Sequence, residues 1–215
     1  DFQKQKYLGN YEFVIVDDES TDSTKAIIQE FEKNSVKFKY ISSNTGDSIL
    51  SFKKKALDAG IRASSYNYLL FTDVDCNIPS SWVRGMAKYF TDRIDYVIGY
   101  SEVLPSNNWV TQFQSFDFLM LMISARGSTN IGYPWASSGQ NQAYRKSIFK
   151  KNGGFSKVAN QLQGDDSLFL QSYRKNTSQN IVFADDINCK IIARQENSLM
   201  SFVKQRIRWS GDARI

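Results

Sequence analysis

Short apolar runs alternate along the first hundred residues with stretches in which apolar residues return every three or four positions. The runs predict β-strands at 11–16, 36–41, 68–72 and 96–100. The stretches between them predict helices that begin near Ser20, after Gly46 and at Pro79. This alternation favours an α/β fold with a mostly parallel sheet flanked by helices, whose ligand sites lie beyond the carboxyl ends of the strands.

The pattern changes after about residue 101, where aromatic and irregular segments become more frequent. The densest apolar cluster, 113–125, is too short to cross a membrane. We favour a buried helix there over a helix at a membrane interface, because Asp117 interrupts the cluster and no basic flank precedes it. The change of pattern indicates a second half of one domain rather than a separate domain.

Length and composition fit one globular domain. The chain has 215 residues, of which 41% are hydrophobic, enough to bury a full core. Its formal net charge of +5 gives only a weak preference for polyanions or phosphate-bearing ligands, and no nucleic-acid partner is predicted. The lysine run 53–55 lies beside apolar helical positions, which favours a solvated helix face over a binding site.

Histidine is absent from the sequence, and the two cysteines, Cys76 and Cys189, lack the spacing of a zinc site. Most serine–histidine and cysteine–histidine nucleophile systems are thereby excluded, so a carboxylate must serve as any general base. Reduced thiols fit a cytosolic setting. Neither a signal peptide nor an apolar run of membrane-spanning length occurs, and the segment itself is expected to be soluble.

Acidic residues follow two of the predicted strands. Asp17 and Asp18 end the first, where they could accept hydrogen bonds from a nucleobase or ribose, or cap the next helix. Asp73 and Asp75 follow the strand 68–72 as a DxD motif. Carboxylates beside a diphosphate require a divalent cation between them, and Mg²⁺ or Mn²⁺ suits oxygen ligands, although a solvated loop would also explain a lone DxD.

Two further motifs lie in the second half. Asp165 and Asp166 precede an apolar helix, where the helix dipole alone would favour acids and where one of them could act as a general base. Near the C-terminus, Gln205, Arg208 and Trp209 form a QxxRW motif and would share one helix face. An arginine there can neutralise a diphosphate and a tryptophan can stack on a sugar ring, but a simple amphipathic helix has the same pattern.

In this order and spacing the four motifs resemble the family 2 glycosyltransferases of the GT-A fold, which include the cellulose, chitin and hyaluronan synthases and many bacterial enzymes. The resemblance spans nearly the whole chain. It implies one catalytic domain, 1–215, with a Rossmann-like nucleotide-sugar-binding half of about 1–100 and an acceptor-binding half of about 101–215. The implied activity is the inverting, metal-dependent transfer of a sugar from a nucleotide-diphosphate donor, preferably a UDP-sugar, to a glycan or lipid-linked acceptor hydroxyl.

The resemblance also implies roles on the donor side. Asp17 or Asp18 would hold the nucleobase, uracil in preference to guanine. Asp73 and Asp75 would bind the nucleotide-sugar and its Mg²⁺ or Mn²⁺, with Asp75 as the more direct ligand. The segment 138–141 resembles the family's acceptor side more loosely.

On the acceptor side, the resemblance implies that Asp166 is the catalytic base and Asp165 its neighbour. Gln205, Arg208 and Trp209 would close over the diphosphate and the acceptor terminus. The charges then suggest a single displacement in which Asp166 removes a proton from the acceptor hydroxyl and the configuration of the sugar inverts.

The family usually has an apolar first strand before the strand that carries the first acids, and only 1–10 precede Tyr11 here. We therefore expect a fragment that lacks this strand, from a parent protein associated with the cytoplasmic side of a membrane. Two other function classes stay open. Intact acids argue against a non-catalytic nucleotide-sugar- or carbohydrate-binding module on the same fold, and the absence of a glycine-rich phosphate loop argues against a sugar-phosphate nucleotidyltransferase.

Overall fold

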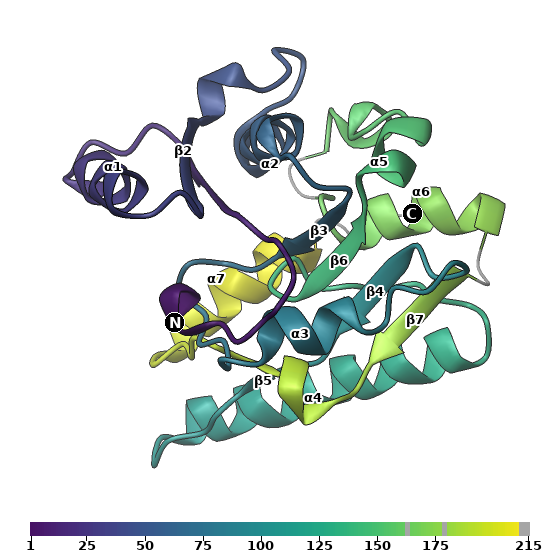
Figure 1. Cartoon of the computed structure of the whole chain (residues 1–215). Coiled ribbons are helices and arrows are strands. Elements are labelled where there is room, and N and C mark those ends of the chain that lie inside the picture. The colour runs from purple at the N-terminus through teal and green to yellow at the C-terminus, as the bar shows by residue number, and fades with distance from the viewer. Residues whose placement is uncertain (162–163, 178–179, 211–215) are drawn as a thin grey trace.

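The computed structural model describes residues 1–161, 164–177 and 180–210. It is an α/β molecule in which a four-stranded sheet lies among helices, while a separate pair of strands stands at one side with two helices of its own (Figure 1). This arrangement confirms the predicted fold class. Over the part of the chain that is described, no helix is both long and apolar enough to cross a membrane.

The strands of the first half fall within two residues of their predicted positions. The strands are β1 (Phe13–Asp17), β2 (Phe38–Ser42), β3 (Tyr68–Phe71), β4 (Tyr96–Gly99), β5 (Ser101–Val103), β6 (Gln142–Arg145), β7 (Ile181–Ala184) and β8 (Ile191–Ala193). The α-helices are α1 (Thr24–Asn34), α2 (Phe52–Ala63), α3 (Trp82–Ala87), α4 (Trp109–Asn130), α5 (Lys146–Lys151), α6 (Ser167–Thr177) and α7 (Leu199–Ser210). Short 3₁₀ turns are η1 (Phe2–Lys4), η2 (Ser43–Thr45), η3 (Ser156–Val158) and η5 (Ile187–Cys189).

The sheets are mixed in direction. In the four-stranded sheet, with the order β3-β6-β4-β7, β4 and β7 run parallel but β6 is antiparallel to both of its neighbours. The pairs β1–β2 and β5–β8 are parallel. The expected parallel centre is therefore wrong for β6, because the chain re-enters the sheet between β3 and β4 from the opposite direction after α4. Strand periodicity cannot reveal this reversal, since it is the same for both directions.

Alternate residues of β4 pack into two separate hydrophobic cores. Tyr96 and Ile98 belong to a cluster with Tyr144 of β6 and Phe169 of α6, while Val97 belongs to a cluster with Trp82 of α3. Successive side chains on a strand point to opposite faces, so α3 covers one face of the sheet and α6 the other. The sheet is thereby buried on both sides, which leaves the carboxyl ends of β3, β4 and β7 and the loop before β6 for the site.

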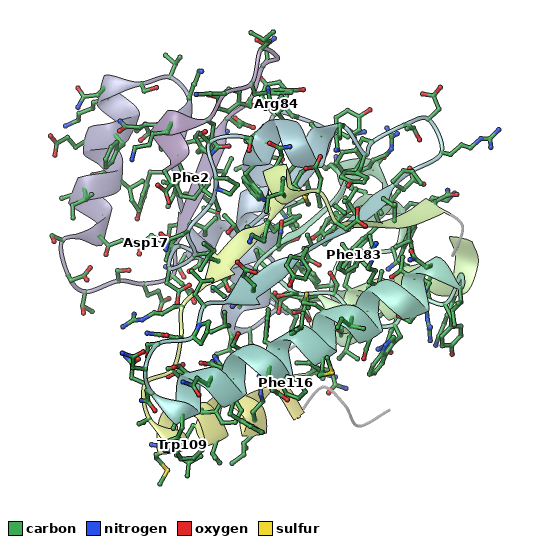
Figure 2. All side chains as sticks on the ribbon, turned by 90° about the horizontal axis from the view of Figure 1, so that it is seen from below. Phe2, Asp17, Arg84, Trp109, Phe116 and Phe183 are labelled. Carbon is green, nitrogen blue, oxygen red and sulfur yellow. The ribbon has the colours of Figure 1, made fainter. Side chains whose placement is uncertain are left out.

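Helix α4 is half buried rather than buried all round. Its inner face carries Phe118 and Met122, which are 3% and 5% exposed, whereas Phe116 and Ile123 on the outer face are 60% and 52% exposed. Figure 2 looks onto this helix, with Trp109 near its start and Phe116 further along. The buried-helix prediction for 113–125 is therefore wrong for the outer face, where apolar residues such as Phe116 and Ile123 are largely exposed.

The lysine run on α2 is only partly solvated. Lys54 is 1% exposed, and its ammonium group donates a hydrogen bond to the carbonyl oxygen of Gln161. Lys53 points into the acidic residues of the candidate site. Ile49 and Phe52, at the start of this stretch, are 62% and 64% exposed although their side chains are apolar. Helix α2 packs closely on β1, where Val16 would crowd any side chain larger than glycine at Gly60.

Candidate active site

The first acidic pair ends β1, and its two members have different environments. Asp17 is 7% exposed and its two oxygens accept hydrogen bonds from Ser20 N at 3.1 Å and Tyr40 Oη at 3.0 Å. The bonds from Ser20, and then from Tyr40, lower the pKa of Asp17. Asp18 is exposed. The structure therefore makes Asp17 a turn-closing acceptor and leaves Asp18 open to solvent, while the nucleobase role of the pair stays a prediction.

The DxD residues lie in the loop that follows β3. This loop is tied down a few residues later, because Asn77 forms an isolated antiparallel bridge with Ile192 of β8. Asp73 is half-buried and Asp75 is exposed. Cys76, next to Asp75, packs against the small apolar cluster that also contacts Trp209. The loop thus lies between the end of the sheet and the C-terminal part of α7.

The third acidic pair begins α6. Asp165 is 4% exposed, and Asp166 accepts hydrogen bonds from the backbone N–H groups of Ser167 and, at 3.0 Å, Gly139. At Gly164, φ is +114°, a conformation that favours glycine, and it turns the chain into the helix. An added Cβ at Gly139 would lie 3.2 Å from Asp165 Oδ2, a tight contact, so the backbone here lies close against the acids.

Lys53 joins the second and third acidic motifs. Its Nζ lies 2.9 Å from Asp73 Oδ1 and 3.6 Å from Asp165 Oδ2. Burial disfavours the charged ammonium group, but the carboxylates of Asp165 and then Asp73 outweigh that effect and raise the pKa of Lys53. A lysine from α2 therefore neutralises acids that come from two distant parts of the sequence.

Asp166 is held in a state suited to proton transfer. Burial, followed by the charge of Asp165, raises the pKa of Asp166 to about 7, while Lys53 acts in the opposite direction. A carboxyl group with a pKa near neutrality can accept a proton from a substrate and release it again.

The QxxRW residues lie on α7, as predicted. Gln205 and Trp209 are half-buried, and Arg208 is exposed. The ring of Trp209 lies 6.1 Å from that of Phe118 on α4. The structure brings Trp209 close to Cys76 through their shared apolar cluster, but no direct contact between Arg208 and the acidic residues is seen among the described residues.

The acids after β3 fit a divalent cation whose coordination is completed by a bound ligand and water. Among the described residues, no three acidic or cysteine side chains are grouped closely enough to hold a metal ion by themselves. Mg²⁺ and Mn²⁺ sites of this class use one or two carboxylates and leave the other positions to phosphate oxygens and water. Asp73 and Asp75 can supply those carboxylates, and Asp73 would have to exchange its bond to Lys53 for the cation.

Comparison with known proteins identifies the family. A model of the glycosyl transferase family 2 matches residues 2–153, which is well over half of the chain. The chain belongs to the glycosyl transferase family 2. It is thus a glycosyltransferase domain, and the predicted enzyme class is confirmed. The match includes the first two acidic motifs and Lys53, whereas Asp165, Asp166 and the QxxRW motif lie beyond it.

Individual relatives of this family 2 domain are distant. Two forms of poly-beta-1,6-N-acetyl-D-glucosamine synthase from Staphylococcus epidermidis are 27% identical over 146 residues, which is 66% of the chain and 34% of each relative. The chain therefore spans about a third of the length of the curated relatives it matches.

Solved structures show the same fold. A mannosyltransferase from Pyrobaculum calidifontis in complex with GDP-Man and Mn²⁺ aligns over 97% of the chain and 55% of its own length, with a TM-score of 0.65 and 16% identity. A mycobacterial protein aligns over 89% of the chain and 59% of its own length, with a TM-score of 0.51 and 16% identity. At this level of identity the likeness concerns the fold alone, and it confirms the GT-A fold.

Two parts of the site differ from the sequence-based interpretation. Lys53 was missed, although it precedes Ala56 and Leu57 by three and four residues and so falls on the apolar face of α2. In the segment 138–141, assigned loosely to the acceptor side, Gly139 does lie at the acids. Asn141, however, is fully buried and bonds to Trp82, a structural position rather than an open binding position.

Replacing Lys53 by Met is expected to shift the acidic limb of the pH–activity profile to higher pH by about one unit. The reason is that the ammonium group lowers the pKa of Asp166. The pH dependence of kcat/KM, or a carboxyl NMR titration of Asp166, measures the shift. Lys55→Met is the control, because Lys55 lies on the same helix but hydrogen-bonds to Asn44 instead. Superimposable profiles for the two variants would show that Lys53 does not act on Asp166.

Proposed function

We propose that this family 2 domain transfers a sugar, with inversion of configuration, from a UDP-sugar to a hydroxyl group of a glycan or lipid-linked acceptor. The observation that carries the proposal is the meeting of Lys53, Asp73, Asp165 and Asp166 at one place. The site combines a carboxylate for a cation and diphosphate with a second carboxylate whose pKa suits a general base.

In the proposed reaction, Asp166 accepts the proton of the acceptor hydroxyl as this oxygen attacks the anomeric carbon from the face opposite the nucleotide. One displacement inverts the configuration and requires no covalent intermediate on the enzyme. Asp73 and Asp75 would hold the divalent cation, and Arg208 would neutralise the departing diphosphate. When bound, the cation stabilises the negative charge that develops on this leaving group. Gln205 and Trp209 would close over the acceptor.

The donor class is supported by several observations. A structural neighbour binds GDP-Man and Mn²⁺, and a curated relative is named as the synthase of an N-acetyl-D-glucosamine polymer. In this chain, Asp17 and Tyr40 lie together beside the exposed Asp18. These groups would receive the nucleobase, and their acceptor oxygens suit the N–H group of uracil. A polysaccharide or glycolipid is accordingly the proposed product.

Replacing Asp75 by Ala is expected to abolish the dependence of UDP binding on Mn²⁺, because the variant loses the carboxylate that would share the cation with the diphosphate. Isothermal calorimetry with UDP, in the presence and absence of Mn²⁺, measures the coupling. Asp92→Ala removes an exposed acid elsewhere and should keep the coupling. Unchanged Mn²⁺-dependent affinity in Asp75→Ala would remove Asp75 from the metal site, and tighter binding of GDP than of UDP would overturn the donor assignment.

We propose in addition that the outer face of α4 and the adjacent α7 lies against a membrane surface on the cytoplasmic side. The exposed apolar residues of the two helices are Trp109, Phe113, Phe116, Leu119, Met120, Leu121, Ile123, Leu199, Met200, Val203 and Ile207. Helix α7 exposes Lys204 and Arg208 and carries no acidic residue. A basic amphipathic helix beside exposed aromatic residues is typical of the interface with anionic lipid.

Replacing Ile123 by Ser is expected to weaken binding to vesicles of phosphatidylcholine and phosphatidylglycerol several-fold, because it puts a hydroxyl group in place of a buried alkyl group at the lipid surface. Cosedimentation measures the bound fraction. Ile27 of α1 has nearly the same exposure, 51% against 52%, so Ile27→Ser is a matched control on another surface. Equal binding by the two variants would contradict the proposed orientation.

A further inference from the structure

Two helices meet at the QxxRW motif, and α4 supplies the partners. Near its start, Asn108 Nδ2 donates to Asn197 O at 2.8 Å, which anchors the segment just before α7. Five residues further on, the ring of Phe113 packs edge-on against Phe202 at a centroid distance of 5.7 Å. These contacts set the position of α7 along α4, but they leave its functional side chains to be oriented by other groups.

A buried amide holds Gln205. Gln114 of α4 is 1% exposed, and its Nε2 donates to Gln205 Oε1 at 3.3 Å while its Oε1 accepts from Glu196 N at 2.9 Å. The Nε2 of Gln205 in turn donates to Glu196 Oε1 at 3.5 Å. The three residues form a closed ring of hydrogen bonds, so the amide of Gln205 has one preferred orientation.

An ion pair holds Trp209. Arg206 pairs with Asp117 of α4, and its guanidinium nitrogens are shielded from solvent. The guanidinium carbon lies 4.3 Å from the ring of Trp209 and 4.9 Å from that of Phe202. A planar guanidinium group stacks well on aromatic rings, and its carboxylate partner fixes where it lies. Asp117 therefore acts on Trp209 through Arg206.

We propose that Gln114 and Asp117 of α4 are positioning residues for glycosyl transfer, which act through Gln205 and through Arg206 and Trp209. This inference rests on the proposed function of the QxxRW motif and extends it to helix α4. Its pairing with Arg206 explains why Asp117 interrupts the apolar cluster of α4. Loss of the Asp117–Arg206 pair would leave nucleotide binding intact and misplace Trp209 during transfer.

The test uses the full-length protein labelled with 5-fluorotryptophan, in which the ¹⁹F resonance of Trp209 is assigned by its disappearance in Trp209→Phe. In Asp117→Asn we expect this resonance to move, kcat to fall about tenfold and the affinity for UDP with Mn²⁺ to change less than twofold. Asp117→Asn leaves the shielded guanidinium charge of Arg206 without a carboxylate partner. The double variant Asp117→Asn with Arg206→Met removes that charge as well and should show the same three results. Asp117→Glu should restore kcat.

The matched control breaks the other ion pair of α4. Asp185 lies 2.6 Å from Arg126 in an exposed pair, so Asp185→Asn should leave the Trp209 resonance and kcat unchanged. The inference is overturned if the Trp209 resonance of the double variant coincides with that of the parent, or if it moves while kcat stays the same. If the unsubstituted protein transfers no sugar, the proposed function is overturned instead. The Trp209 resonance would still show whether Asp117 positions Trp209.

Discussion

Replacing Asp166 by Asn is expected to lower the rate of sugar transfer about a thousandfold while donor binding persists. A general base contributes on the order of 10²–10⁴ to a rate, and an amide cannot accept the proton of the acceptor hydroxyl. Asn keeps the size of the side chain and an oxygen that can accept the hydrogen bond from Gly139 N. The variant should therefore fold and bind UDP with Mn²⁺ as the parent does.

The pH profile gives an independent reading of the same group. Since the pKa of Asp166 is raised to about 7, the ionised base is lost as the pH falls through that value. We expect kcat/KM of the parent to fall about tenfold for each pH unit below about 7. The residual rate of Asp166→Asn should lack this acidic limb.

An exposed acid provides the comparison for Asp166. Asp92→Asn makes the same chemical change at the surface, and it should retain the parent rate and the parent pH profile. Transfer by Asp166→Asn within a few-fold of the parent would assign the base to another group. If the parent bound UDP but turned over no nucleotide-sugar, a binding module would replace the enzyme as the better interpretation.

Replacing Asn141 by Leu is expected to lower the free energy of unfolding by about 3–5 kcal/mol. The Asn141 side chain is fully buried, and its Nδ2 donates to Tyr100 O at 2.8 Å and to Cys189 O at 2.9 Å. Its Oδ1 accepts from Trp82 Nε1 at 3.1 Å. Leucine fills a similar volume but leaves these partners unpaired, at about 1–3 kcal/mol for each buried polar group.

Thermal and urea denaturation measure this effect. For a domain of this size the melting temperature should drop by about 10 °C. Asn107→Leu is the control, because Asn107 is exposed and the same substitution there should change stability by less than about 0.5 kcal/mol. If Asn141→Leu were as stable as the unsubstituted protein, the hydrogen bonds of Asn141 would not stabilise the core. An acceptor-side role for 138–141 would then be favoured again.

The strands of the first half could be predicted because their apolar runs are short and end at polar residues. The direction of β6 could not, since an antiparallel strand has the same period as a parallel one. Helix α4 illustrates a second limit. Its outer face is as apolar as its inner face, so hydrophobicity predicted burial, whereas the structure buries the inner face and leaves most of the outer face exposed.

In the candidate site, too, some features could be predicted from the sequence and others could not. Asp73, Asp165 and Asp166 could be singled out by residue type and by their places after a strand and before a helix, and their order supported the resemblance to the family. Lys53 was missed because an isolated lysine run is normally solvated. Its role depends on α2 packing into the same core as Leu69 of β3 and Phe169 of α6, so that one ammonium group reaches acids that follow β3 and precede α6.

Sequence alone determined the fold class, the enzyme family and the acids that we propose for the chemistry, because periodicity and motif order are properties of the chain. Tertiary structure decided how those acids are charged and held. Burial beside Asp165 brings the pKa of Asp166 near neutrality, and α4 orients the QxxRW side chains. Both effects depend on distances between residues remote in sequence, and electrostatic energies change steeply with such distances.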